Sequence, residues 1–102
     1  MTPNVTLVNN LVINNTTAGS SQAAVAYRRS GVLSATYMAA SDNNLFYAGT
    51  PGATRLIYGE SLAAAPTNAK QTLADFKTWV GPTRDANSRT ETATPFVNAA
   101  TD

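Results

Sequence analysis

The chain has 102 residues, of which 43% are apolar and 13% charged, with a formal net charge of +1 and neither cysteine nor histidine. This length allows one domain with a hydrophobic core, and the scattered basic residues argue against a nucleic-acid binder. The lack of cysteine excludes a disulfide framework and thiol chemistry, and no apolar run approaches the roughly 20 residues of a membrane span.

The first predicted β segment, Val5–Ile13, alternates with period two and contains the doublet Asn9-Asn10. A near copy of its second half, Asn43-Asn44-Leu45-Phe46-Tyr47, follows 34 residues after Asn9-Asn10-Leu11-Val12-Ile13. Two interpretations compete. The doublet is either the type I′ turn of a β-hairpin or a corner between strands of one layer in a solenoid. The downstream copy favours the solenoid.

Further short strands are predicted near residues 23–27, 32–40, 45–47 and 54–58, with polar or charged loops between them. The segment Ala24–Tyr27 corresponds to Arg55–Tyr58 at a spacing of 31 residues. Strands that recur while their loops vary in length are typical of stacked solenoid layers, or rungs.

After Gly59 the composition changes, and an alanine-rich connector over residues 61–65 leads to a predicted helix near residues 72–80. Thr72 is the expected N-cap, with Asp75 three residues on, and Gly81 followed by proline is the expected stop. Leu73, Phe76 and Val80 give this helix one apolar face. Beyond the helix, residues 83–94 are polar and irregular, and residues 95–98 form a last extended piece.

The segments 4–16 and 41–47, the helix over 72–81, the loop Arg84-Asp85-Ala86-Asn87-Ser88 and the piece 94–98 together resemble right-handed parallel β-helix repeat proteins. The resemblance is to the C-terminal part of secreted, pectate-lyase-like or surface-anchored bacterial proteins of this type. Thr94 stands where those chains usually have aspartate. The resemblance implies an all-β fold, a short right-handed parallel β-helix of about two to three rungs with one short lateral α-helix near residues 72–80. Residues 1–102 would then be a single β-helix segment, a piece of a longer solenoid.

Two sets of candidate residues follow from these patterns. Asn9, Asn10, Asn43 and Asn44 are expected to form a structural ladder whose amides bond from rung to rung, with a polar binding face as the alternative. Tyr27, Tyr47 and Tyr58 recur at strand ends, and with Arg55 they are candidate ligand-binding residues that would stack on sugar rings. Packing within the strands is the favoured interpretation of the tyrosines.

No catalytic residue, metal site or cofactor is predicted. Glycoside chemistry needs clustered carboxylates, and of the six acidic residues only Asp42 and Glu60 lie in the predicted rungs. The lack of histidine and cysteine removes an imidazole base and a thiol nucleophile. The chain alone is therefore expected to have no enzymatic activity.

The expected function is that of a structural or adhesive segment of an exported or cell-surface bacterial protein, with polysaccharide as the ligand class that the resemblance implies. One alternative is a fragment of a polysaccharide lyase or glycoside hydrolase whose active site lies outside this chain. Another is a virion or assembly subunit with an antiparallel sheet, in which Asn9-Asn10 is a hairpin turn. Self-association through open strand edges is expected, because unpaired edges invite pairing with another chain.

Overall fold

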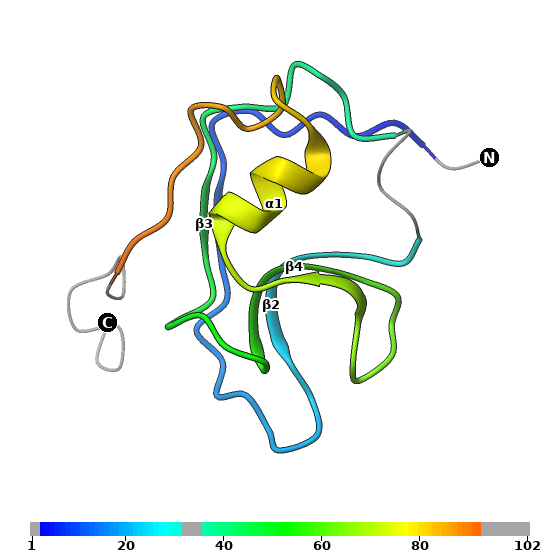
Figure 1. Cartoon of the computed structure of the whole chain (residues 1–102), viewed down its shortest axis with the longest axis vertical. Coiled ribbons are helices and arrows are strands. Elements are labelled where there is room, and N and C mark those ends of the chain that lie inside the picture. The colour runs from blue at the N-terminus through cyan, green and yellow to red at the C-terminus, as the bar shows by residue number, and fades with distance from the viewer. Residues whose placement is uncertain (1–2, 32–35, 93–102) are drawn as a thin grey trace.

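The computed structural model describes residues 3–31 and 36–92, and this part of the chain forms short strands and one helix (Figure 1). The elements in chain order are β1 (Leu11–Ile13), β2 (Ala24–Arg29), β3 (Leu45–Tyr47), β4 (Arg55–Glu60), β5 (Thr67–Lys70) and α1 (Leu73–Val80). They make two small sheets, one with the order β1-β3 and one with the order β2-β4-β5.

Strands β1 and β3 are parallel, and Leu11 pairs with Leu45, which confirms the predicted spacing of 34 residues. In Figure 1 the blue segment that contains β1 runs beside the green β3. The preceding segment continues this pairing, because Val8 bridges Asp42 and Val5 bridges Tyr37, both in the parallel sense. The hairpin interpretation of Asn9-Asn10 is therefore wrong, since the residues on either side of the doublet pair with the downstream segment.

Strands β2 and β4 are also parallel, with Tyr27 beside Tyr58, and this confirms the predicted spacing of 31 residues. Strand β5 was not predicted, and it pairs antiparallel with β4. Its register is irregular, and Asn68 within it has φ 48°, as in a β-bulge. The turn of the chain from β4 into β5 brings Pro66 close to Gly59. A Cβ atom added to Gly59 would lie 2.8 Å from the Cβ of Pro66.

The predicted right-handed parallel β-helix, with its repeat and solenoid character, is wrong for the described residues. Strand pairing divides into a parallel two-stranded sheet and a mixed three-stranded sheet. The alanine-rich connector after Glu60 returns the chain antiparallel against β4 instead of carrying it into another parallel layer. Helix α1 comes directly after β5 and packs against the core. The chain after β5 therefore forms a helix where a solenoid would have another parallel strand.

The predicted helix is confirmed as α1, and its ends have the expected caps. The Thr72 hydroxyl accepts a hydrogen bond from the Asp75 backbone N–H at 3.1 Å. Gly81 has φ 96°, a conformation that glycine adopts without strain, and its N–H donates to the Lys77 carbonyl. An isolated helix of this length is unstable in water, so α1 depends on its buried face.

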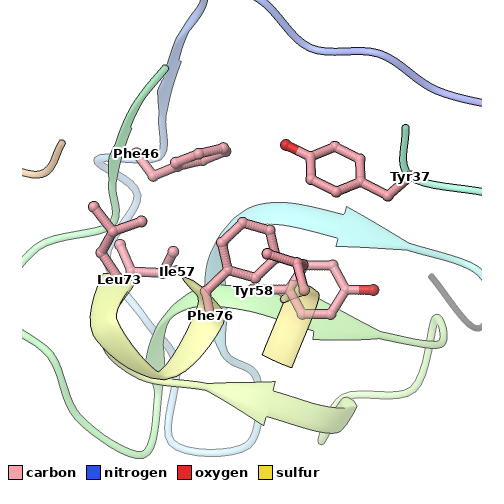
Figure 2. Packing of buried hydrophobic residues seen from close by; sticks show 7 residues of the cluster. Tyr37, Phe46, Ile57, Tyr58, Leu73 and Phe76 are labelled. Atoms are coloured by element: carbon pink, nitrogen blue, oxygen red, sulfur yellow. The ribbon is translucent and has the colours of Figure 1, made fainter. Parts of the chain in front are cut away.

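The buried face of α1 meets the strands in one hydrophobic core (Figure 2). Phe76 is fully buried, its ring stacked on Tyr58 at 5.0 Å between centroids and set edge-on to Phe46 at 5.5 Å. Each fully buried ring of this kind contributes about 1.5–3 kcal/mol through removal of apolar surface from water. The core consists of Tyr37, Phe46, Ile57, Tyr58, Leu73, Phe76 and Val80.

Parts of two predicted elements lie outside the described residues. The strand expected over residues 32–40 is described only from residue 36, where Tyr37 makes an isolated bridge to Val5. The extended piece at residues 95–98 is not among the described residues. Among those that are, no helix is both long enough and apolar enough to cross a membrane.

Candidate functional site

An open polar groove lies where three segments of the chain come side by side. Its volume is about 420 Å³. The three segments are residues 9–11, 43–45 and 87–89, and Arg89 is the charged member of the lining. The lining residues are Asn9, Asn10, Leu11, Asn43, Asn44, Leu45, Asn87 and Arg89.

The strand register sets the order of these segments. Leu45 pairs in parallel with Leu11 on one side and makes a parallel bridge to Arg89 on the other. The Arg89 N–H donates to the Asn44 carbonyl at 2.8 Å, and the Phe46 N–H donates to the Arg89 carbonyl at 2.9 Å. Because neighbouring strands lie about 4.8 Å apart, the side chains of Asn9, Asn43 and Asn87 form an array with roughly that spacing.

The first asparagine of each doublet turns the chain. Asn9 and Asn43 have φ values of 59° and 57°, in the left-handed region that asparagine tolerates better than most residues. Both side chains are exposed at the groove. The first asparagine of each doublet thus places its amide in solvent at the corner, and in the downstream doublet the second asparagine, Asn44, lies in the interior.

The second asparagine of the downstream doublet, Asn44, is almost fully buried and uses both ends of its amide. Its Oδ1 accepts from the Asn10 backbone N–H at 2.9 Å and from the Asn10 Nδ2 at 3.2 Å. Its Nδ2 donates to the Leu7 carbonyl at 2.8 Å and to Asp85 Oδ1 at 2.9 Å. Asn44 therefore ties the first segment to the loop that carries the third.

Asp85 is fully buried behind the groove and has φ 52°. Its carboxylate accepts hydrogen bonds from Asn44, from the Ser88 hydroxyl at 2.6 Å and from the Tyr37 hydroxyl. Burial of Tyr37, together with its hydrogen bond to this carboxylate, raises the tyrosine pKa well above its ordinary value. The Tyr37 hydroxyl is therefore the hydrogen-bond donor to Asp85, and the carboxylate is enclosed by its partners.

The half-buried Asp42 binds the third segment through Asn87. Its Oδ1 accepts from the Asn87 backbone N–H, and its Oδ2 accepts from the Asn87 Nδ2, both at 2.7 Å. The hydrogen bonds from the Asn87 side chain and backbone lower the pKa of Asp42 below its ordinary 3.8. Asn87 is at the same time one of the residues that line the groove.

A second buried carboxylate, Glu60, lies at the end of β4 and is 2% exposed. It accepts from the Tyr58 hydroxyl at 2.8 Å and from Asn68 Nδ2 at 2.6 Å. Burial and this hydrogen bond raise the pKa of Tyr58 above its ordinary value. Glu60 thus fastens β5 to β4 and offers no open carboxylate to a substrate.

The four residues predicted to bind a ligand are buried or half-buried in the structure. Tyr58 is fully buried, Tyr47 is 6% exposed, and the ring of Tyr27 packs on that of Tyr58 at 5.6 Å between centroids. Arg55 Nη1 donates to the carbonyls of Thr16 at 3.2 Å and Ala48 at 3.1 Å. Stacking on a sugar needs an exposed ring face, and Tyr58 offers none.

The sequence pattern pointed to the asparagine doublets and missed the third segment of the groove. Asn87 and Arg89 lie 44 residues after Asn43 and Leu45, because the hairpin of β4 and β5 and the helix α1 intervene. The signal that would have found them is the run Asn87-Ser88-Arg89, which places a polar residue at each doublet position.

Within residues 3–31 and 36–92, no group of three or more acidic, histidine or cysteine residues is placed to hold a metal ion. Comparison of the chain with protein-family models, with curated proteins and with solved structures finds no match in any of the three.

Proposed function

We propose that this chain is a structural and adhesive module of an exported or cell-surface protein, and that it binds carbohydrate in the groove of residues 9–11, 43–45 and 87–89. The observation that carries the proposal is the array of asparagine amides from three adjacent segments, open to solvent on one face. The inference concerns a binding role, not catalysis.

Amide side chains suit a hydroxyl-rich ligand, because each has an acceptor and two donors and so can match a sugar hydroxyl in either role. The exposed Asn9 and Asn43 amides repeat at about the strand spacing of 4.8 Å, which is close to the length of one sugar unit in an extended chain. A repeating polymer can therefore meet equivalent groups along the groove.

Two further lining residues supplement the amides. Leu11 is 69% exposed, and it offers an apolar surface to the C–H face of a sugar ring. Arg89 is exposed at the same groove, and a guanidinium recognises a carboxylate with two parallel hydrogen bonds. This combination favours a polysaccharide that carries both hydroxyl and carboxylate groups.

The acidic residues near the groove support a binding role over a catalytic one. Asp85 is enclosed by three donors, and Asp42 accepts two hydrogen bonds from Asn87. A glycosidase needs two carboxyl groups that face the scissile bond from opposite sides. Neither of these carboxylates is arranged in that way.

The test is binding of the chain to a panel of neutral and uronate-containing polysaccharides, followed by titration calorimetry with each polysaccharide that binds. The double variant Asn9→Gly/Asn43→Gly removes two amides, while glycine adopts the positive φ of both positions without strain. We expect at least about a tenfold weaker binding, since each lost hydrogen bond contributes about 1 kcal/mol. Asn15→Gly, at an exposed asparagine outside the groove lining, is the matched control and should bind as the wild type does.

Arg89→Gln separates the two ligand classes. It should weaken binding to uronate polymers and leave binding to neutral polymers nearly unchanged. The proposal would be refuted if no polysaccharide of the panel bound, or if the double glycine variant bound as tightly as the wild type.

A further inference from the structure

Strand β1 has an open edge. The Leu45 N–H donates to the Asn10 carbonyl at 2.9 Å, and the Asn14 N–H donates to the Tyr47 carbonyl at 2.9 Å. In a parallel ladder each residue directs its N–H and its C=O toward one neighbour, and successive residues alternate. The backbone groups of Leu11 and Ile13 are consequently directed away from β3, at the edge of the sheet with the order β1-β3.

This edge lacks the usual protection against pairing with another chain. Residues 5–16 contain no lysine, arginine, aspartate, glutamate or proline. Leu11 is 69% exposed and Val8 is 44% exposed along the same stretch. By contrast, β2, one of the two edge strands of the other sheet, carries Arg28 and Arg29, which are charges of the kind that protects edge strands.

We propose that two copies of this chain associate through β1, with the two strands antiparallel about a two-fold axis at Val12. In this register Leu11 lies opposite Ile13 of the second copy, and each such pair exchanges both of its backbone hydrogen bonds. The pairing joins the β1-β3 sheets of the two copies into one continuous sheet with the order β3-β1-β1-β3.

The side chains fit this register. Val12 packs against the core, so Leu11 and Ile13 lie on the other face of the strand. There each exposed Leu11 meets Ile13 of the second copy as a cross-strand apolar pair.

A second copy suits this edge for two reasons. The edge is uncharged, so two identical edges meet without like-charge repulsion. The outward-facing residues Leu11 and Ile13 are also equidistant from Val12, so one two-fold operation satisfies both, as in an isologous dimer. With a paired segment of only three residues in each copy, the dimer is weak and concentration-dependent.

The test is sedimentation equilibrium of the full chain over a concentration series from about 10 µM to about 1 mM. The wild type should show a reversible monomer–dimer equilibrium. Leu11→Lys should weaken it by on the order of a hundredfold, because one leucine from each copy loses its burial. Leu62→Lys introduces the same change at a position that is 80% exposed in the connector before β5, and it should dimerise as the wild type does.

A charge-swap experiment separates a specific interface from a general loss of solubility or fold. Leu11→Lys mixed with Leu11→Glu should associate more strongly than either variant alone, because opposite charges replace like charges across the two-fold axis, but more weakly than the wild type, because an exposed ion pair contributes less than two buried leucines. Each variant alone should keep an unchanged far-ultraviolet circular dichroism spectrum. A wild type that stays monomeric at every concentration, a Leu62→Lys variant weakened as much as Leu11→Lys, or a mixture that associates no more strongly than either variant alone would each overturn the proposal. Because Leu11 lines the groove and is covered in the dimer, carbohydrate binding is measured in dilute, monomeric solution, where it tests the groove separately.

Discussion

Replacing Asn44 by alanine removes the side chain that ties the first segment of the groove to the loop that carries the third. The side chain is 2% exposed, and its amide bonds with Asn10, with the Leu7 carbonyl and with Asp85. Alanine leaves each of these groups one partner short and opens a small cavity. The variant therefore tests how much the hydrogen bonds of this amide stabilise the fold.

The expected loss can be worked out from those contacts. A buried polar group left without its partner costs about 1–3 kcal/mol. Asn10 is exposed, so water replaces much of what its N–H loses, whereas Leu7 is half-buried and Asp85 fully buried. We expect the free energy of unfolding to fall by about 3–4 kcal/mol, a large share of the roughly 5–15 kcal/mol of a domain.

The assay is urea unfolding followed by the fluorescence of Trp79, the single tryptophan of the chain. Asn43→Gly is the matched control, because it removes the neighbouring, exposed amide at a φ of 57° that glycine readily adopts. The control should change the free energy of unfolding by less than about 0.5 kcal/mol. If Asn44→Ala costs less than about 1 kcal/mol, the reasoning about the buried network is refuted.

Two other predictions concern the return strand and the third segment of the groove. Gly59→Ala should lower the free energy of unfolding by about 1–3 kcal/mol, because its Cβ would lie 2.8 Å from that of Pro66. Gly19→Ala should leave the free energy of unfolding unchanged, because a Cβ added there meets nothing within 4 Å. Thermal unfolding of both variants measures the difference. The lowered pKa of Asp42 means that its contribution to stability is present above pH 3.8 and is lost as the pH falls further. Asp42→Asn should therefore be less stable than the wild type near neutral pH and approach it in acid; a difference independent of pH would contradict this.

The sequence predicted the parts of the fold that depend on local signals. The doublets Asn9-Asn10 and Asn43-Asn44 gave the register of β1 on β3, because both need a corner that asparagine tolerates. Helix α1 was predicted with its caps, since Thr72 and Gly81 act within one turn of the helix ends.

The fold class could not be predicted from these signals. Strand β5 has the sequence Thr-Asn-Ala-Lys, which lacks the β-branched and aromatic residues of a typical strand. Its pairing with β4 depends on contacts made after the chain returns, among them Asn68 with Glu60. A parallel solenoid was therefore predicted where the structure has a mixed sheet.

The structure places the predicted ladder residues at one groove and most of the predicted ligand-binding residues in the interior. Asn9, Asn10, Asn43 and Asn44 all lie at one groove, with Asn10 and Asn44 hydrogen-bonded to each other. The tyrosines lie mostly in the interior. Their burial could not be predicted, because the alternation of residues along a strand does not say which face of the strand is buried. Tyr58, for example, is enclosed by α1 through its contact with Phe76.

The most direct test of the binding groove is a nuclear magnetic resonance titration of the side-chain amides with a uronate-containing oligosaccharide. The account predicts that the signals of Asn9, Asn43 and Asn87 shift together and saturate at one ligand concentration, while that of Asn15 stays in place. Titration without any shift in these three amides, or with shifts confined to residues outside the groove, would contradict it.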